Sequence, residues 1–356
     1  MLLKKLKLNK IAMTVALATT ATTAQAGYKI ELTDKDSIEF GGYLKADARY
    51  VTGDVAYRDY WIGSGTPSAD ASQFKIHAKE SRFNTKYTHG DVMAFIEMDF
   101  YGGGGNEVIS NSSHPRLRHA FIKYDKWLMG QTWSTFMNLT AIPEAVDFAG
   151  GTMGLAFVRQ GQIRYTNGNF QVAIENPETW GSDINGNTAS TANDNLPDLV
   201  GKYTFKGDWG NVSVGAVLQK VDSDVSSETG VGYSIAGRIK AGGKDDIRFQ
   251  LHGGQTGRYV GVVTSTALVN GEYEKQTAFT VAYRHFWNEG DRSSIYYANA
   301  DTELTNRNRS QFGVNYFKAL TNKLSVGMEY GRFTQDDDGT EEVSSDYLQL
   351  SAIFKF

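Results

Sequence analysis

The chain has 356 residues and no Cys, with 36 Lys and Arg against 40 Asp and Glu, for a formal net charge of −4. The negative balance argues against nucleic-acid binding, which usually depends on a basic surface. Lack of Cys excludes disulfide scaffolds, thiolate zinc sites, iron–sulfur clusters and cysteine nucleophiles. Aromatic residues make up 12% of the chain, which indicates a folded protein rather than a disordered one.

The first 26 residues have the pattern of a secretory signal peptide. A basic stretch with four lysines is followed by the apolar residues 11–17 and by the small-residue site Ala24-Gln25-Ala26. We expect cleavage of residues 1–26, so that Gly27 begins the mature chain and residues 27–37 form a short segment before the main domain. An amphipathic N-terminal helix is the alternative. An exported chain without Cys suits a bacterial envelope.

After this segment, apolar and polar residues alternate with a period of two, as in β-strands. In the last segment Leu348, Leu350, Ala352, Phe354 and Phe356 share one face, and Tyr347, Gln349, Ser351, Ile353 and Lys355 share the other. The same pattern predicts sixteen strands, over residues 38–52, 73–88, 91–101, 115–125, 127–133, 159–166, 170–176, 198–206, 209–221, 230–240, 244–254, 274–287, 291–301, 308–318, 323–333 and 344–356.

The connections between these segments alternate strictly between short turns and long polar loops. An up-and-down antiparallel sheet then has all its short turns at one rim and its long loops at the other, as bacterial outer-membrane barrels do. The charged faces could not form a dry core, and sixteen strands leave a water-filled lumen. The sequence predicts an all-β, 16-stranded antiparallel transmembrane β-barrel over residues 38–356, with short periplasmic turns and long extracellular loops.

The inward faces of these strands carry many basic residues. We expect the pore to be lined by Arg49, Arg82, Arg116, Arg118, Arg164, Arg238 and Arg284. Guanidinium groups bind carboxylates in a planar, bidentate way, and rings of Arg and Lys favour anion pores. The alternative is that these arginines pair with wall acids such as Glu97, Asp99 and Glu175 and only make the wall rigid.

The connection 134–158 is too apolar for an exposed loop. We expect it to fold into the lumen as a constriction loop, with Glu144 and Asp147 opposite the basic wall. An apolar segment of this kind could instead cover a contact between subunits.

These features favour a passive outer-membrane diffusion porin that passes small hydrophilic solutes, prefers anions and needs no cofactor or metal. One alternative is an outer-membrane enzyme of the lipase or protease type, for which His119 and Ser134 are the only pair worth testing. No G-x-S-x-G or H-E-x-x-H motif supports it. A non-conducting structural barrel is the other alternative, against which the glycine-rich, charged inner faces argue.

Several motifs in residues 80–177 are familiar, among them Ser81-Arg82-Phe83, Glu97-Met98-Asp99-Phe100, Arg116-Leu117-Arg118-His119-Ala120-Phe121 and Gly130-Gln131-Thr132-Trp133-Ser134-Thr135-Phe136. Their order resembles the DcaP-like outer-membrane porins of Gram-negative bacteria. The resemblance implies a homotrimer that takes up dicarboxylates, with Arg82, Arg116, Arg118 and Arg164 at the eyelet. It also implies recognition by the barrel-assembly machinery through the last strand, which ends in Phe356. The coiled-coil extension that precedes the barrel in some members is expected to be absent.

Overall fold

The structure is a computed structural model, and it describes residues 27–61, 70–106, 108–261 and 264–356. The signal peptide expected over residues 1–26 lies outside the described residues. Where the alternating pattern occurs, the structure has strands with their apolar side chains outward. Leu350 is 50% exposed on the outer face, whereas its neighbour Gln349 is 1% exposed on the inner face. Exposed apolar residues outside and buried polar residues inside are the arrangement of a membrane barrel.

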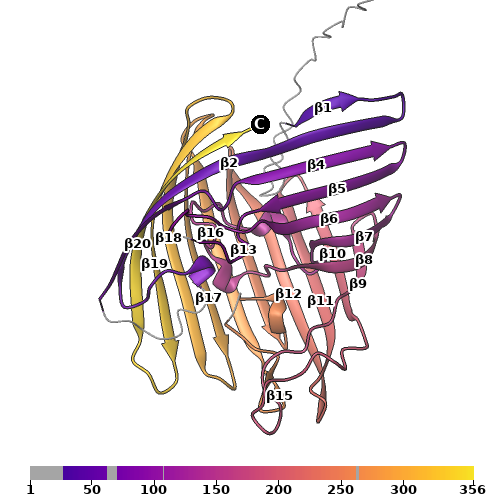
Figure 1. The fold of residues 1–356 in the computed structure, drawn as a ribbon, viewed down its shortest axis with the longest axis vertical. Helices are drawn as coiled ribbons and strands as arrows, with labels where there is room; N and C mark the ends of the chain where they lie inside the picture. Colours follow the sequence, from indigo (N-terminus) through magenta and orange to yellow (C-terminus); the bar gives the residue numbers. More distant parts are fainter. Residues whose placement is uncertain (1–26, 62–69, 107, 262–263) are drawn as a thin grey trace, which may run out of the picture.

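The wall consists of long antiparallel strands joined edge to edge (Figure 1). Its strands are β2 (Asp36–Gly53), β3 (Ala71–His77), β4 (Arg82–His89), β5 (Val92–Asp99), β6 (Arg116–Tyr124), β7 (Trp127–Trp133), β8 (Arg159–Asn167), β9 (Phe170–Glu175), β10 (Asp198–Gly207), β11 (Gly210–Asp222), β12 (Ser227–Gly242), β13 (Asp245–Gly254), β16 (Gln276–Phe286), β17 (Asp291–Thr302), β18 (Arg307–Ala319), β19 (Leu324–Asp337) and β20 (Val343–Lys355).

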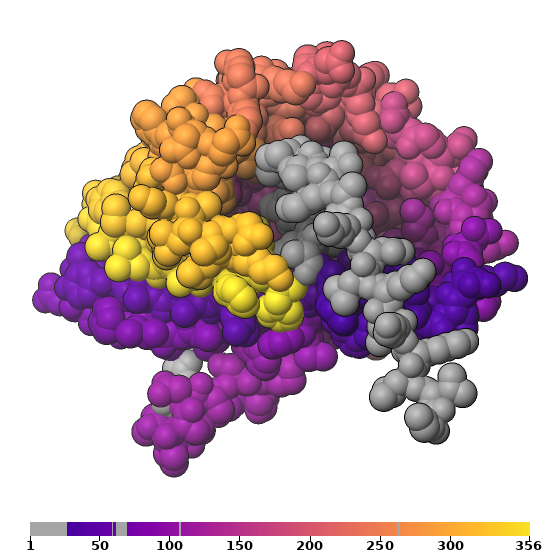
Figure 2. Space-filling model, turned by 90° about the horizontal axis from the view of Figure 1, so that it is seen from above, coloured from indigo at the N-terminus to yellow at the C-terminus, as the bar shows by residue number. Residues whose placement is uncertain are grey.

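The sheet closes on itself because β20 pairs with β2 along residues 43–53 of β2. The predicted closed barrel of 16 antiparallel strands is confirmed, with β3 and β4 together occupying one position in the wall. Seen from above, the strands surround a hollow (Figure 2). Among the described residues, no helix is long and apolar enough to cross a membrane.

Two details differ from the sequence prediction. The strand expected over residues 73–88 is interrupted at 78–81, so that β3 pairs with the end of β2 and β4 pairs with its beginning. The segment expected to precede the barrel contains β1 (Tyr28–Glu31), which pairs with β2 where Tyr28 faces Phe40. Because β20 ends opposite Tyr43 of β2, β1 pairs with the part of β2 that lies beyond the end of β20.

The connections add only short elements. The described residues contain four 3-10 turns, η1 (Asp59–Trp61), η2 (Leu139–Ala141), η3 (Thr152–Gly154) and η4 (Gly257–Tyr259), and a small hairpin that joins β14 (Leu268–Val269) to β15 (Glu272–Tyr273). Both η2 and η3 lie in the long connection between β7 and β8. This connection covers residues 134–158, and we call it the inner loop.

The height of the wall is uneven around the barrel. Strands β4 to β9 have six to nine residues each, whereas the wall strands from β10 to β20, which do not include the two-residue β14 and β15, have between 10 and 16. The connection between β5 and β6 projects away from the barrel (Figure 2).

Candidate functional site

The inner loop turns into the lumen, as the sequence predicts, because its backbone is held by inward side chains of the far wall. The N–H groups of Gly151 and Ala156 donate to the side-chain oxygens of Gln311 and Gln250, at 3.0 and 3.2 Å. Nδ2 of Asn138 donates to Ser213 at 3.0 Å. Phe136, Met137 and Leu155 of the loop are at most 1% exposed and pack with Val217 and other residues of the wall. The apolar composition of the loop is therefore explained by burial inside the barrel.

The two acids of the inner loop bind arginines of the wall. Glu144 accepts hydrogen bonds from Arg292, at 2.6 Å from Nη2, and from Arg284, at 3.1 Å from Nη1. Asp147 forms an ion pair with Arg49. The sequence predicts that both acids lie opposite the basic wall. In the structure each is paired with a guanidinium of the strands that hold the loop, because a desolvated carboxylate is costly without a charged partner or hydrogen-bond donors.

Glu144 belongs to the inner loop rather than to a spanning strand, and its environment favours the charged form. Burial alone would raise its pKa, but the positive charges of Arg292, Arg284 and Arg248 and the hydrogen bond from Arg292 outweigh it. Together they lower the pKa of Glu144 to about 2. The ion pairs of Glu144 are therefore formed at neutral pH.

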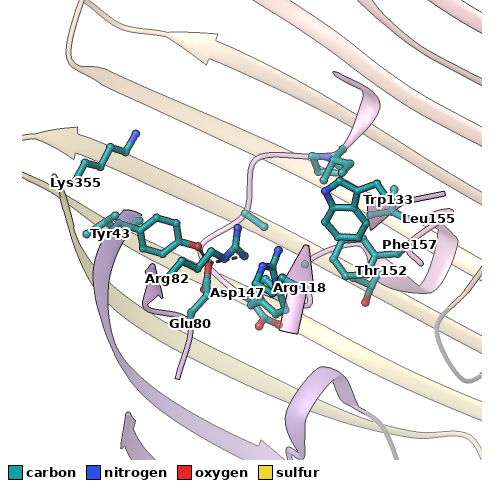
Figure 3. Close-up of a pocket in the computed structure, with 16 residues that line it drawn as sticks. Tyr43, Glu80, Arg82, Arg118, Trp133, Asp147, Thr152, Leu155, Phe157 and Lys355 are labelled. Atoms are coloured by element: carbon teal, nitrogen blue, oxygen red, sulfur yellow. Dashed lines mark hydrogen bonds and ion pairs between the residues drawn. The ribbon is translucent and has the colours of Figure 1, made fainter. Parts of the chain in front are cut away.

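Between the inner loop and the opposite wall lies a cavity of about 250 Å³ (Figure 3). Its wall side carries the cationic side chains of Arg82, Arg118 and Lys355, together with Tyr43 and Glu80. Its other side is largely apolar and comes from the loop and its neighbours: Trp133, Ile142, Pro143, Ala145, Phe148, Leu155 and Phe157. The cavity thus has a basic face and an apolar face.

The acids near the basic face are already bound. Glu80 pairs with Lys45 and accepts a hydrogen bond from Tyr43 at 2.9 Å. Arg118 donates to Glu97 and Asp99, both at 2.8 Å, and Asp99 also binds Arg116. The alternative expected from the sequence, in which lumen arginines form ion pairs with acids of the wall, is therefore present for Arg116 and Arg118.

Several arginines have a guanidinium N–H group without a hydrogen-bond partner among the described residues, Arg49 and Arg248 included, and two of these arginines stack on aromatic residues that line the cavity. Nε of Arg82 and Nη1 of Arg159 are buried and have no hydrogen-bond partner within the described part of the chain. Arg82 lies 3.8 Å from Glu80, its nearest acid. The guanidinium of Arg159 lies 4.3 Å from the ring centre of Trp133, and that of Arg82 lies 5.4 Å from Phe148. Such stacking holds the planar groups in place.

The other arginines expected at the pore lie elsewhere on the inner wall. Arg164 donates to Gln162 at 2.9 Å and to the carbonyl of Trp133. Arg238 faces Arg248 across the β12–β13 pair, and Arg284 bridges Asp246 and Glu144. Neither Arg49 nor these three lines the cavity described above.

The sequence analysis does not name Lys355, Arg159 or Arg292 among the expected pore residues. Alternation in the last strand puts Lys355 on the polar face, and this signal was sufficient to find it. Arg159 and Arg292 stand at strand starts, where alternation is weakest. Among the described residues, no group of three or more His, Asp or Glu is arranged to hold a metal ion. His119 hydrogen-bonds Thr132 at 2.9 Å, and no contact with Ser134 is found among the described residues.

Comparison with known proteins agrees with this geometry. The model of the family described as DcaP outer membrane protein matches residues 4–338. The crystal structure of the outer membrane channel DcaP of Acinetobacter baumannii superposes with a TM-score of 0.81 at 21% identity, over 92% of this chain and 99% of that one.

More distant porins share the fold. The anion-selective porin from Comamonas acidovorans has a TM-score of 0.60 at 12% identity, covering 90% of this chain and 100% of its own. Salmonella typhi OmpF in complex with daunomycin has a TM-score of 0.58 at 14% identity, covering 92% and 100%. No curated protein sequence matches the chain.

Proposed function

Because the chain belongs to the DcaP outer membrane protein family, we propose that it passes small hydrophilic solutes with a preference for anions such as dicarboxylates. Family membership and fold identify the protein as an integral channel of the outer membrane rather than an enzyme. The finer preference is supported by the cavity beside the inner loop.

The observation that carries the proposal is the charge around this cavity. Its lining cations are Arg82, Arg118 and Lys355, and its lining acids, Glu80 and Asp147, are bound to Lys45 and Arg49. Charges that are already paired attract a passing ion weakly, whereas a cation without a close acid keeps more of its field. The main residues we propose for anion passage are therefore Arg82, Arg159 and Lys355, with a smaller contribution from Arg116 and Arg118, which are both paired with Asp99.

Dicarboxylates suit such a site better than single anions. A solute with two carboxylates can contact two guanidinium groups at once, and each planar group can bind one carboxylate through two hydrogen bonds. The apolar loop face would accommodate the carbon chain between them. We expect uptake of succinate into proteoliposomes to exceed that of a diamine and a neutral polyol of matched length. Faster uptake of the diamine would contradict the proposal.

We also propose that the protein assembles as a homotrimer, through the low part of the wall. A membrane-spanning β-strand needs about 9–11 residues, and β7 and β9 have only seven and six. Residues 72–76 of β3 are all exposed, including Phe74 and Ile76. In the projecting connection Val108 is 96% exposed and Ile109 is 83% exposed. A neighbouring copy would cover these surfaces, since large exposed apolar patches mark interfaces.

Two further proposals concern biogenesis. We propose that residues 1–26 are the export signal and that the barrel-assembly machinery recognises the last strand with Phe356. The ring of Phe356 lies beside that of Phe83, with 5.7 Å between ring centres. Deletion of Phe356 is expected to reduce the amount of folded barrel in the outer membrane, measured by heat-modifiable migration on gels. An unchanged amount would contradict the assignment.

A further inference from the structure

A buried carboxylate on the wall holds the tip of the inner loop. Glu329 lies on the inner face of β19 and has an exposed fraction of 0%. Five groups donate hydrogen bonds to its two oxygens: the N–H of Val146 at 2.7 Å, the N–H of Asp147 at 3.2 Å, Nδ2 of Asn315 at 2.9 Å, and the hydroxyls of Tyr296 and Tyr347, both at 3.0 Å.

This arrangement requires a carboxylate. An ionised carboxyl group has only acceptor sites, so it can satisfy all five donors at once. An amide of the same shape would direct its own N–H groups at donors and leave some of them unpaired, which is costly in a buried place. No ion pair to Glu329 is found among the described residues, so these hydrogen bonds are its visible stabilisation.

The surrounding wall is shaped to admit the two tyrosines. A Cβ atom on Gly313 would lie 2.3 Å from the ring of Tyr296, and one on Gly331 would lie 2.4 Å from the ring of Tyr347. Only residues without a side chain fit at these two positions. Asn315 adds a second contact with the loop, because its Nδ2 also donates to the carbonyl of Glu144 at 2.8 Å.

The held part of the loop also lines the cavity. Ala145, Asp147 and Phe148 face the cavity, and the two peptide N–H groups bound by Glu329 lie among them. The Phe148 ring centre is 5.4 Å from the guanidinium of Arg82 and 5.7 Å from that of Arg118. A displacement of the loop tip would therefore change the opening and its contact with both arginines.

We propose that Glu329 is a positioning residue that sets the size of the constriction by fixing the loop tip at Val146 and Asp147. The inference rests on the channel function and not on the anion preference. Glu144 and its two arginines anchor the same stretch from one side, so loss of Glu329 loosens the tip without releasing the whole loop.

The test is Glu329→Gln in the full-length protein, with single-channel currents recorded in planar bilayers. Each pore of the wild type is expected to show one steady open level. The variant is expected to lose this steadiness, with added current levels and higher noise, and its ion preference is expected to weaken as the opening widens. A general loss of barrel stability would change the yield of folded protein rather than the levels within one open channel.

Glu274→Gln is the matched control. Glu274 is also 0% exposed and also holds a loop, accepting from the N–H of Leu304 at 2.7 Å and the hydroxyl of Thr305 at 2.8 Å. These contacts join long loops at the rim of the barrel and do not involve the inner loop, so the control is expected to keep the wild-type current levels. If Glu329→Gln does not fold, Tyr296→Phe with Tyr347→Phe removes two donors, keeps the carboxylate, and is expected to raise the noise to a smaller degree.

The outcomes separate the positioning role of Glu329 from the proposed anion preference. A steady Glu329→Gln channel with wild-type conductance and selectivity would overturn the positioning role. If Glu274→Gln were as noisy as Glu329→Gln, the effect would not be specific to the inner loop, and the proposal would also fail. Cation preference in the wild type, with noise confined to Glu329→Gln, would overturn the proposed selectivity and leave the positioning role intact.

Discussion

The arginines of the inner wall fall into two groups that the sequence does not distinguish. Arg116 and Arg118 share Asp99, at 2.7 and 2.8 Å, whereas Arg82 lies 3.8 Å from Glu80, its nearest acid, and no ion pair of Arg159 is found among the described residues. Alternation predicts that each side chain faces the lumen. It cannot predict which acids they meet, because Glu80, Glu97 and Asp99 approach from other strands or from the strand break. The arginines without a close acid are therefore the residues with the largest expected effect on ions.

Arg82 provides the residue-scale prediction. A unit charge about 7 Å from a passing ion in water favours an anion by about 0.6 kcal/mol and disfavours a cation equally, so Arg82→Gln is expected to lower the anion-to-cation permeability ratio by roughly sevenfold. The measurement is the zero-current potential in a planar bilayer. Arg309→Gln, which removes the same charge from a pair with Asp337 near the rim, is the control and is expected to change the ratio little. Equal effects of the two variants would count against a special role for Arg82.

At the scale of elements, the inner loop is held by ionic and hydrogen-bonding contacts whose wall partners come from many strands. Its inward fold was predictable from its apolar composition. Its orientation was not, since the direction of Glu144 depends on Arg284 and Arg292, which are 140 and 148 residues away in the chain.

Removal of the Glu144 charge is expected to destabilise the loop. Glu144→Gln leaves Arg284 and Arg292 without this shared partner, and breaking a buried ion pair from one side costs about 3 kcal/mol. The expected result is faster amide hydrogen exchange across residues 139–151, with protection of the wall strands unchanged. Exchange at the wild-type rate would show that the other contacts of the loop are sufficient.

The lowered pKa of Glu144 predicts that the stability of the inner loop depends on pH. The pKa of Glu144 is lowered from 4.5 to about 2, so its ion pairs stabilise the loop at pH values above 4.5, and this contribution is lost as the pH falls toward 2. Hydrogen exchange of the loop, corrected for the intrinsic pH dependence, is expected to stay constant from pH 7 to about 5 and to accelerate below about 4. Acceleration already near pH 6 would point to a different group. In Glu144→Gln this pH dependence should be reduced.

At the scale of the whole molecule, the barrel was predictable because its signals are repeated along the chain. The alternation of apolar and polar residues predicts the strands. The regular change between short and long connections predicts an up-and-down sheet whose two rims differ. The break at residues 78–81 was not predictable, since Lys79-Glu80-Ser81 continues a polar stretch that suits a strand. It arises where the wall becomes low and where Glu80 turns inward to bind Lys45.

The low wall provides a prediction about assembly. Val108→Asp with Ile109→Asp places charges on the projecting connection and is expected to weaken the proposed trimer, because buried unpaired charges are unfavourable at an interface. Native mass spectrometry in detergent should show more monomer than in the wild type. Val225→Asp, at an exposed apolar residue of another loop, is the control. A trimer that resists the double variant would place the interface elsewhere.

The central claim is that the constriction prefers anions because its acids are already paired and its least paired charges, those of Arg82 and Lys355, are cationic. The most direct test is the zero-current potential of the purified wild-type channel under a potassium chloride gradient in a planar bilayer. The account predicts a potential with the sign of chloride preference, which should decrease in Arg82→Gln. A potential with the sign of potassium preference would contradict it, and would mean that acids such as Glu80 and Asp147 determine the field despite their partners.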